Sequence, residues 1–147
     1  MTSKSRKPPS LIAKQPPSKN VSKGVVAILM YDYHVAEDNG KQGLIGVFDT
    51  LAAPQFPARF SFFLFIKFTG EPGQHSARIE LIDKVGGRKV LEFPDYGFNL
   101  PSRPVTHHNL ITQVNMEFPS PGVQEWSVYY DDVLSGQYPF QVVIGDQ

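Results

Sequence analysis

The chain has 147 residues, of which 41% are hydrophobic and 12% aromatic, enough apolar material for the core of one domain. Its 14 basic and 14 acidic residues balance, which excludes a uniformly basic nucleic-acid binder and a strongly acidic solvating chain. Cysteine is absent, so disulfides, thiol nucleophiles and cysteine-based metal centres are excluded. No apolar run approaches the ~20 residues that a membrane helix requires. We expect a cytoplasmic protein without a cofactor or a membrane contact.

Residues 1–23 differ in composition from everything that follows them. They are rich in Ser, Lys and Pro, and they contain no acidic and no aromatic residue. Such a segment buries too little apolar surface to offset its ordering entropy, so we expect a disordered tail over 1–23 and a folded domain over 24–147. A polyanion or nucleic acid is a possible ligand of the tail, through its basic residues Lys4, Arg6, Lys7, Lys14, Lys19 and Lys23. The alternative is a solvated tail, or one that folds back on the acidic domain that follows it.

The first two predicted strands cover 25–33 and 44–51, where apolar and β-branched residues dominate. Between them stands Asn39-Gly40, which predicts a hairpin because both central positions of such a turn favour positive φ. Pro54 and Pro57 then mark a rigid corner. These features predict an antiparallel strand pair at the beginning of the folded domain.

A third strand, over 60–68, has the clearest two-residue periodicity in the chain. One of its faces is wholly apolar and consists of Phe60, Phe62, Leu64, Ile66 and Phe68. The other face is apolar only in its middle and consists of Ser61, Phe63, Phe65 and Lys67. This pattern is typical of a central strand whose back is partly covered.

Five further strands are predicted over 77–81, 89–93, 110–118, 126–130 and 140–144, with Gly- and Pro-containing turns between most of them. The segment 94–104 is expected to be a long loop where the chain crosses between layers. Eight short strands with tight turns favour an antiparallel, Greek-key-like β-sandwich. Parallel pairing is not expected, since it needs long crossovers for which the sequence has no room.

Two short motifs stand out, Gly43-Leu44-Ile45-Gly46-Val47-Phe48 and Phe56-Pro57-Ala58. They resemble the core signature of a family of small bacterial proteins known only as a domain of unknown function. Further matching positions are Asp32 at the end of the preceding strand and, near the end of the chain, Phe118, Gly122, Trp126, Val128 and Tyr130. The resemblance covers roughly residues 24–145. It implies a β-sandwich and supplies no activity and no catalytic residues.

Aromatic side chains are the main candidates for a binding surface, because such rings stack on ligands or anchor protein interfaces. The predicted candidates are Phe63 and Phe65 on the more polar face of the 60–68 strand, Tyr96 and Phe98 in the 94–104 loop, and Tyr129. The alternative for each ring is a place in the core or in a cap over its end. A sugar-binding platform would need Tyr96, Phe98 and Tyr129 to lie coplanar and exposed.

Reactive groups do not form a recognisable motif. His107 and His108 are adjacent, and neighbouring residues of a strand point to opposite faces, so they do not bind one metal together. Ser102 with His107 lacks a nucleophile elbow. A calcium site would require the 32–39 loop to meet Asp131 and Asp132. We assign no catalytic residue and no metal site.

The leading hypothesis is therefore a non-enzymatic binding module whose partner is a protein and whose recognition surface is the aromatic set or the 94–104 loop. The first alternative is polyanion contact through the tail. The second is a metal-dependent or hydrolytic enzyme that uses His107 or His108. The oligomeric state does not follow from the sequence.

Overall fold

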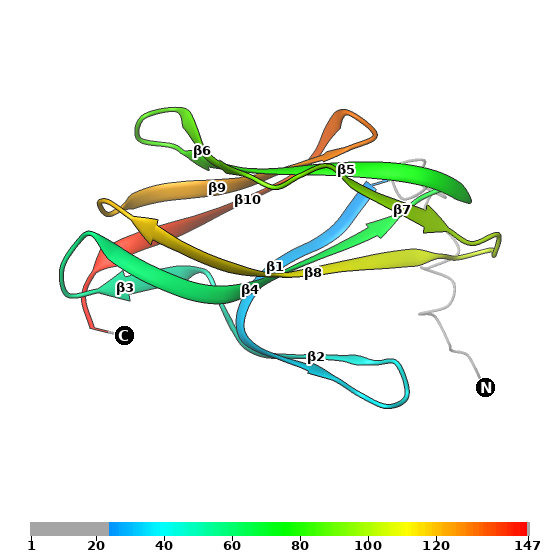
Figure 1. Cartoon of the computed structure of the whole chain (residues 1–147), viewed down its shortest axis with the longest axis horizontal. Coiled ribbons are helices and arrows are strands. Elements are labelled where there is room, and N and C mark those ends of the chain that lie inside the picture. Colours follow the sequence, from blue (N-terminus) through cyan, green and yellow to red (C-terminus); the bar gives the residue numbers. More distant parts are fainter. Residues whose placement is uncertain (1–23, 147) are drawn as a thin grey trace, which may run out of the picture.

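The structure is a computed structural model that describes residues 24–146; the predicted tail over 1–23 lies outside the described residues. Within that range the chain is all-β, with two stacked sheets (Figure 1). No helix that could cross a membrane occurs in this part of the chain. The strands are β1 (Gly24–Ala36), β2 (Gln42–Phe48), β3 (Thr50–Ala53), β4 (Ala58–Thr69), β5 (Gly73–Asp83), β6 (Arg88–Glu92), β7 (Tyr96–Leu100), β8 (His107–Phe118), β9 (Gly122–Tyr130) and β10 (Val133–Ile144).

The two sheets have four and six strands. The four-stranded sheet has the order β2-β1-β4-β8, and the other has the order β3-β10-β9-β5-β6. β7 also belongs to the second sheet, because it pairs with the first half of β5 while β6 pairs with the second half. The two sheets form the predicted sandwich.

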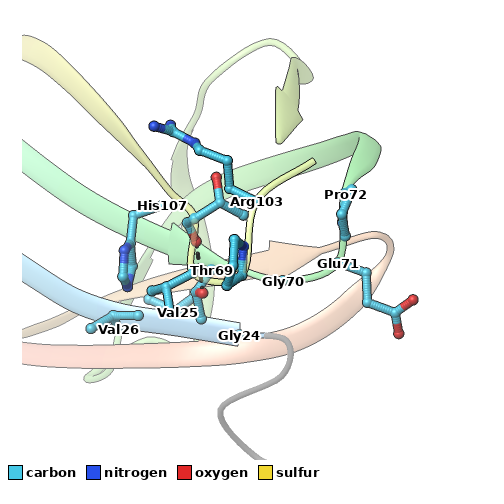
Figure 2. A pocket seen from close by; sticks show the side chains of 12 residues that line it. Gly24, Val25, Val26, Thr69, Gly70, Glu71, Pro72, Arg103 and His107 are labelled. Atoms are coloured by element: carbon cyan, nitrogen blue, oxygen red, sulfur yellow. Dashed lines mark hydrogen bonds between the residues drawn. The ribbon is translucent and has the colours of Figure 1, made fainter. Parts of the chain in front are cut away.

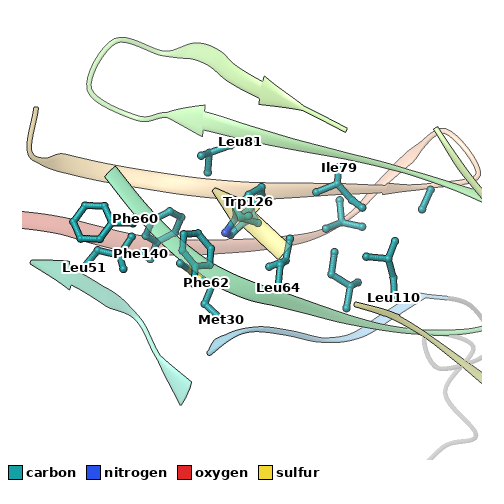
Figure 3. Close-up of a cluster of buried hydrophobic side chains, with 14 of the residues drawn as sticks. Met30, Leu51, Phe60, Phe62, Leu64, Ile79, Leu81, Leu110, Trp126 and Phe140 are labelled. Atoms are coloured by element: carbon teal, nitrogen blue, oxygen red, sulfur yellow. The ribbon is translucent and has the colours of Figure 1, made fainter. Parts of the chain in front are cut away.

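The core lies between the sheets and confirms the predicted inner face of β4 (Figure 3). All five apolar residues of that face are buried, and they pack against a core that includes Trp126, Val128 and Tyr130 of β9. Aromatic contacts extend through it, such as Trp126 against Phe140 with 6.3 Å between ring centroids. Because burying a large apolar side chain stabilises a fold by about 1.5–3 kcal/mol, this interior dominates the stability of the domain.

The structure has ten strands where the sequence predicts eight. The predicted strand 44–51 is two strands, because the chain leaves the first sheet at Asp49 and enters the second as β3. The predicted loop 94–104 contains β7, which completes the edge of β5 beside β6. An apolar run shows that a segment is buried, but it does not show where the chain changes sheets.

The expectation of purely antiparallel pairing is wrong at one position. β3 and β10 pair in parallel, with Leu51 opposite Val142. The need for a long crossover applies to parallel strands that follow one another closely in the chain. Here six strands separate the two partners, so the intervening domain makes the connection.

Gly46 explains part of the Gly43–Phe48 motif. Its φ is +77°, and a Cβ built there would lie 2.5 Å from the Asp32 carboxylate oxygen Oδ2 and 3.1 Å from the Asp32 Cβ. The register of β1 and β2 continues on both sides of this point, with Tyr31 opposite Val47 and Tyr33 opposite Ile45. A glycine is therefore required where Asp32 lies against the neighbouring strand.

We predict that Gly46→Ala lowers the free energy of unfolding by about 1–3 kcal/mol, through left-handed backbone strain and the collision with Asp32. Urea unfolding measures the loss. Gly40→Ala is the control, because Gly40 has a similar φ of +86° but nothing within 4 Å of the added Cβ. An equal loss in both variants would show that the Asp32 contact contributes nothing.

Candidate functional site

Tyr96 and Phe98 belong to an interior aromatic cluster and not to a surface loop. Phe98 is buried, stacks on Phe68 at 4.9 Å, and stacks on His108 at 4.6 Å between ring centroids. Tyr96 is half-buried, and its hydroxyl lies 2.5 Å from Nε2 of His108. These contacts join β7 of one sheet to β8 of the other, which is a packing role.

Burial determines the protonation of this cluster. Desolvation lowers the pKa of His108, and it raises the pKa of Tyr96. Both shifts favour neutral side chains, so the Tyr96 hydroxyl donates its hydrogen bond to an unprotonated Nε2 of His108. Nearby, burial and, to a smaller extent, the charge of Asp131 raise the pKa of Tyr130 to about 12.

His75 makes two hydrogen bonds at the same end of the sandwich. Its Nδ1 lies 2.8 Å from Oδ2 of Asp131, and its Nε2 lies 2.7 Å from the backbone oxygen of Glu71. Asp131 also accepts a bond from the backbone N–H of Ser76 at 2.9 Å. Both partners of the ring are oxygen acceptors, so both bonds form together only when each ring nitrogen carries a proton. The arrangement fastens the β9–β10 turn to the start of β5.

Phe63 and Phe65 lie on the outer face of the four-stranded sheet. Phe65 is buried, and the Lys67 ammonium lies 6.0 Å from the centre of its ring. Phe63 is half-buried and stacks on Tyr31 with 5.6 Å between ring centroids. The partly covered back that the sequence predicts for this strand is confirmed.

Tyr129, the fifth predicted ring, is covered by a charged side chain on the outer face of the second sheet. The Arg78 guanidinium lies 4.1 Å from the centre of the Tyr129 ring, and its Nε donates to Glu80 at 3.0 Å. The rings of Tyr96, Phe98 and Tyr129 do not form the coplanar exposed surface that sugar binding would require, because Phe98 is buried.

The hairpin of β1 and β2 carries four exposed apolar side chains on two paired strands. β1 pairs with β4 only as far as Tyr31, so the later part of β1 pairs with β2 alone. This two-stranded ribbon projects from the body of the sandwich (Figure 1). The exposed fractions are 67% for Tyr33, 45% for Val35, 53% for Ile45 and 53% for Val47.

A chain of hydrogen bonds runs along this hairpin from Tyr31 toward the turn. The Tyr31 hydroxyl lies 2.7 Å from Nδ1 of His34, and Nε2 of His34 lies 2.7 Å from Oε1 of Gln42. A neutral ring with its proton on Nε2 satisfies both partners, because Tyr31 then donates and the Gln42 oxygen accepts. The second bond ties β1 to Gln42, which pairs with Ala36 beside the turn.

Sequence reasoning missed this surface because alternation predicts which residues share a face and not whether that face is covered. One feature of the sequence points to this surface. The segment Gln42–Phe48 contains no charged residue and no proline, although such residues commonly protect the edge strands of natural sheets.

A pocket of about 740 Å³ lies at the Gly24 end of the sandwich (Figure 2). The side chains of Arg103 and Glu71 point away from one another, and His107 points toward Val26 (Figure 2). Thr69 donates a hydrogen bond of 2.9 Å to the backbone oxygen of Thr106. The reactive side chains around this pocket do not converge on a common point.

The carboxylates proposed for calcium do not meet. Asp131 lies against the start of β5, near the first residues of β1, whereas the turn with Asp38 follows the far end of that 13-residue strand. Between residues 24 and 146 no group of three or more His, Asp or Glu side chains is placed to hold a metal ion.

The fold and the exposed hairpin define an all-β sandwich without a recognisable reactive centre. A family model matches residues 28–143, and the chain belongs to that family, DUF6941, which is a family of unknown function. This membership confirms the resemblance that the sequence motifs carry. A comparison with curated proteins found no match.

Solved structures give only distant likenesses. A β-glucosidase from Listeria innocua aligns with 65% of this chain at 11% identity and a TM-score of 0.48, and the chain spans 15% of that enzyme's length. The CARDB domain of a Pyrococcus furiosus protein, in complex with di-metal ions, aligns with 83% of this chain and 96% of its own at 10% identity and a TM-score of 0.41. At these TM-scores the likenesses carry no argument about function.

We predict that His108 makes the domain less stable in mild acid. Its pKa is lowered in the folded state, so the unfolded chain takes up the proton first as the pH falls. Its contribution to stability is complete above about pH 6.5 and is lost as the pH falls through the folded-state pKa. His108→Gln should flatten the decline in urea-unfolding free energy below that pH, whereas His107→Gln, at an exposed neighbouring position, should not. An unchanged decline in His108→Gln would contradict the assignment.

We predict that Asp131→Ala lowers the free energy of unfolding by about 1–3 kcal/mol, because it leaves the His75 Nδ1–H and the Ser76 N–H without this acceptor. Asp132→Ala is the matched control, since both residues have positive φ, 48° for Asp131 and 68° for Asp132. The Asp132 carboxylate is exposed, so its loss should cost much less. Thermal unfolding of both variants gives the comparison, and equal losses would rule out a stabilising role for the His75 contacts.

Proposed function

We propose that the chain is a non-enzymatic protein-interaction module that binds its partner through the β1–β2 hairpin. The observation that carries the proposal is the group of exposed apolar side chains on that hairpin, which includes Tyr33, Ile45 and Val47. Contiguous apolar surface of this kind, with a polar rim, is typical of protein interaction sites. A protein partner and a cytoplasmic location remain predictions from the sequence.

The order within the hairpin supports this role. The hydrogen bonds from Tyr31 to His34 and from His34 to Gln42 connect β1 to the first residue of β2, and Phe63 stacks on Tyr31. A surface that is already ordered loses less conformational entropy when a partner binds, and more of the contact energy then appears as affinity. Phe63 thus contributes to the proposed surface as support for the hairpin.

The described residues favour interaction over catalysis. His108 bonds to Tyr96 inside the aromatic cluster, and His107 lies in a pocket whose charged side chains diverge (Figure 2). A hydrolytic or metal-dependent reaction needs a base, an acid or ligands that meet at one point. The polyanion alternative depends on the basic residues of 1–23, which lie outside the described residues, and it remains a prediction.

We predict that Tyr33→Ser and Ile45→Ser each weaken capture of a native partner by about tenfold, as expected for interface anchors. The full-length protein is immobilised, exposed to native cell extract, and the bound proteins are quantified by mass spectrometry. Val85→Ser and Val105→Ser are the matched controls, because these valines are 77% and 72% exposed but lie outside the hairpin. A partner lost only in the hairpin variants supports the proposal. Capture that is equal in all four variants contradicts it.

A further inference from the structure

β2 differs from the other strands that end a sheet. Open edges in natural proteins are protected by short length, charged side chains or proline, since unpaired backbone groups attract further strands. β3 has four residues, β6 has charged residues at three of its five positions, and β8 alternates apolar residues with Asn109, Gln113, Asn115 and Glu117. β2 has seven residues and contains neither a charge nor a proline. β7, which pairs only with β5, also contains neither a charge nor a proline, but it has five residues. Among the described edge strands without a charge or a proline, β2 is therefore the longer.

The surroundings of this open edge are acidic. Lys41 is the only basic residue between 32 and 49, apart from His34. The exposed acidic residues of the same stretch are Asp32, Glu37, Asp38 and Asp49. Within residues 24–146 none of these carboxylates forms an ion pair with another side chain. The edge therefore presents an apolar strand within an excess of negative charge.

We propose that β2 binds an extended basic segment of a partner protein, which adds as a fifth strand to the four-stranded sheet. This inference rests on the proposed function and names the chemistry of the partner. Backbone hydrogen bonds to an open edge provide affinity, and alternate side chains provide specificity. Apolar side chains of the segment would lie beside Ile45 and Val47, and its Lys or Arg side chains would reach the surrounding carboxylates.

Charge also decides against pairing of β2 with the β2 strand of a second copy of this chain. Pairing two β2 strands would bring two acidic hairpins together, and like charges across an interface lower affinity. A basic segment removes this repulsion. The net charge around the edge therefore distinguishes the two occupants, and the oligomeric state of the free protein is part of the test.

The test measures fluorescence anisotropy of labelled peptides with the full-length protein. The probe is a seven-residue peptide of alternating lysine and valine, the length of β2, and its comparison is the same peptide with glutamate in place of lysine. We expect the lysine peptide to bind at least about tenfold more tightly than the glutamate peptide at low salt. Glu37→Lys combined with Asp49→Lys should remove that preference. The control combines Asp95→Lys with Glu117→Lys, which changes the net charge by the same amount at exposed positions outside the hairpin. This control should retain the preference for the lysine peptide.

Each outcome supports or overturns the inference. The inference is supported if the preference for the lysine peptide is lost only when Glu37→Lys and Asp49→Lys are combined, and if Ile45→Lys also weakens binding of that peptide. Equal binding of both peptides, no binding, or equal effects of the two charge pairs overturns it, and so does a dimer in light scattering that Ile45→Lys dissociates. If the peptide test fails but Tyr33→Ser and Ile45→Ser still reduce partner capture, the proposed function stands. Only the inference that the partner segment is basic is then wrong.

Discussion

Burial of the inner face of β4 against the opposite sheet is the interaction on which the rest of the structure depends. Phe62, Leu64, Ile66 and Phe68 are almost completely inaccessible, and so are Trp126 and Val128 of β9. This contact sets the distance and alignment of the sheets, since large side chains from both must interdigitate at the density of a protein interior. The aromatic cluster around Phe98 and the bonds of His75 then close one end of that interior.

The hairpin follows from the limits of this core. β1 pairs with β4 only up to Tyr31, and beyond that residue it has no strand on that side. Its continuation with β2 is held by its own ladder and by the hydrogen bonds of His34, while Tyr33 and Ile45 remain exposed. An ordered apolar ribbon outside the core contributes little to stability through burial. Its exposed apolar side chains are the basis of the proposed binding role.

Local periodicity was enough to predict the sandwich and the inner face of β4. Turn residues were enough to predict the hairpin at Asn39-Gly40, although only Gly40 of the two has positive φ. The place where 44–51 changes sheets, the strand β7 and the parallel pair of β3 with β10 depend on partners far away in the sequence. The same limit applies to the site. Phe65 and Phe98 are aromatic candidates in the sequence and buried in the structure, whereas Tyr33 and Val47 belong to predicted strands and are exposed. Exposure depends on which strands end beside a residue, and no local pattern contains that information.

Amide hydrogen exchange along β2 in the free protein tests the account most directly, because it reports whether the hairpin is both ordered and open. The account predicts that exchange rates alternate along β2, with slow exchange of amides bonded to β1 and rapid exchange of amides that face away from it. The amides of β4 and β9 should be protected throughout. Slow exchange at every position of Gln42–Phe48 would mean that the edge is already covered. Rapid exchange at every position would mean that the ribbon is not formed, and either result would contradict the account.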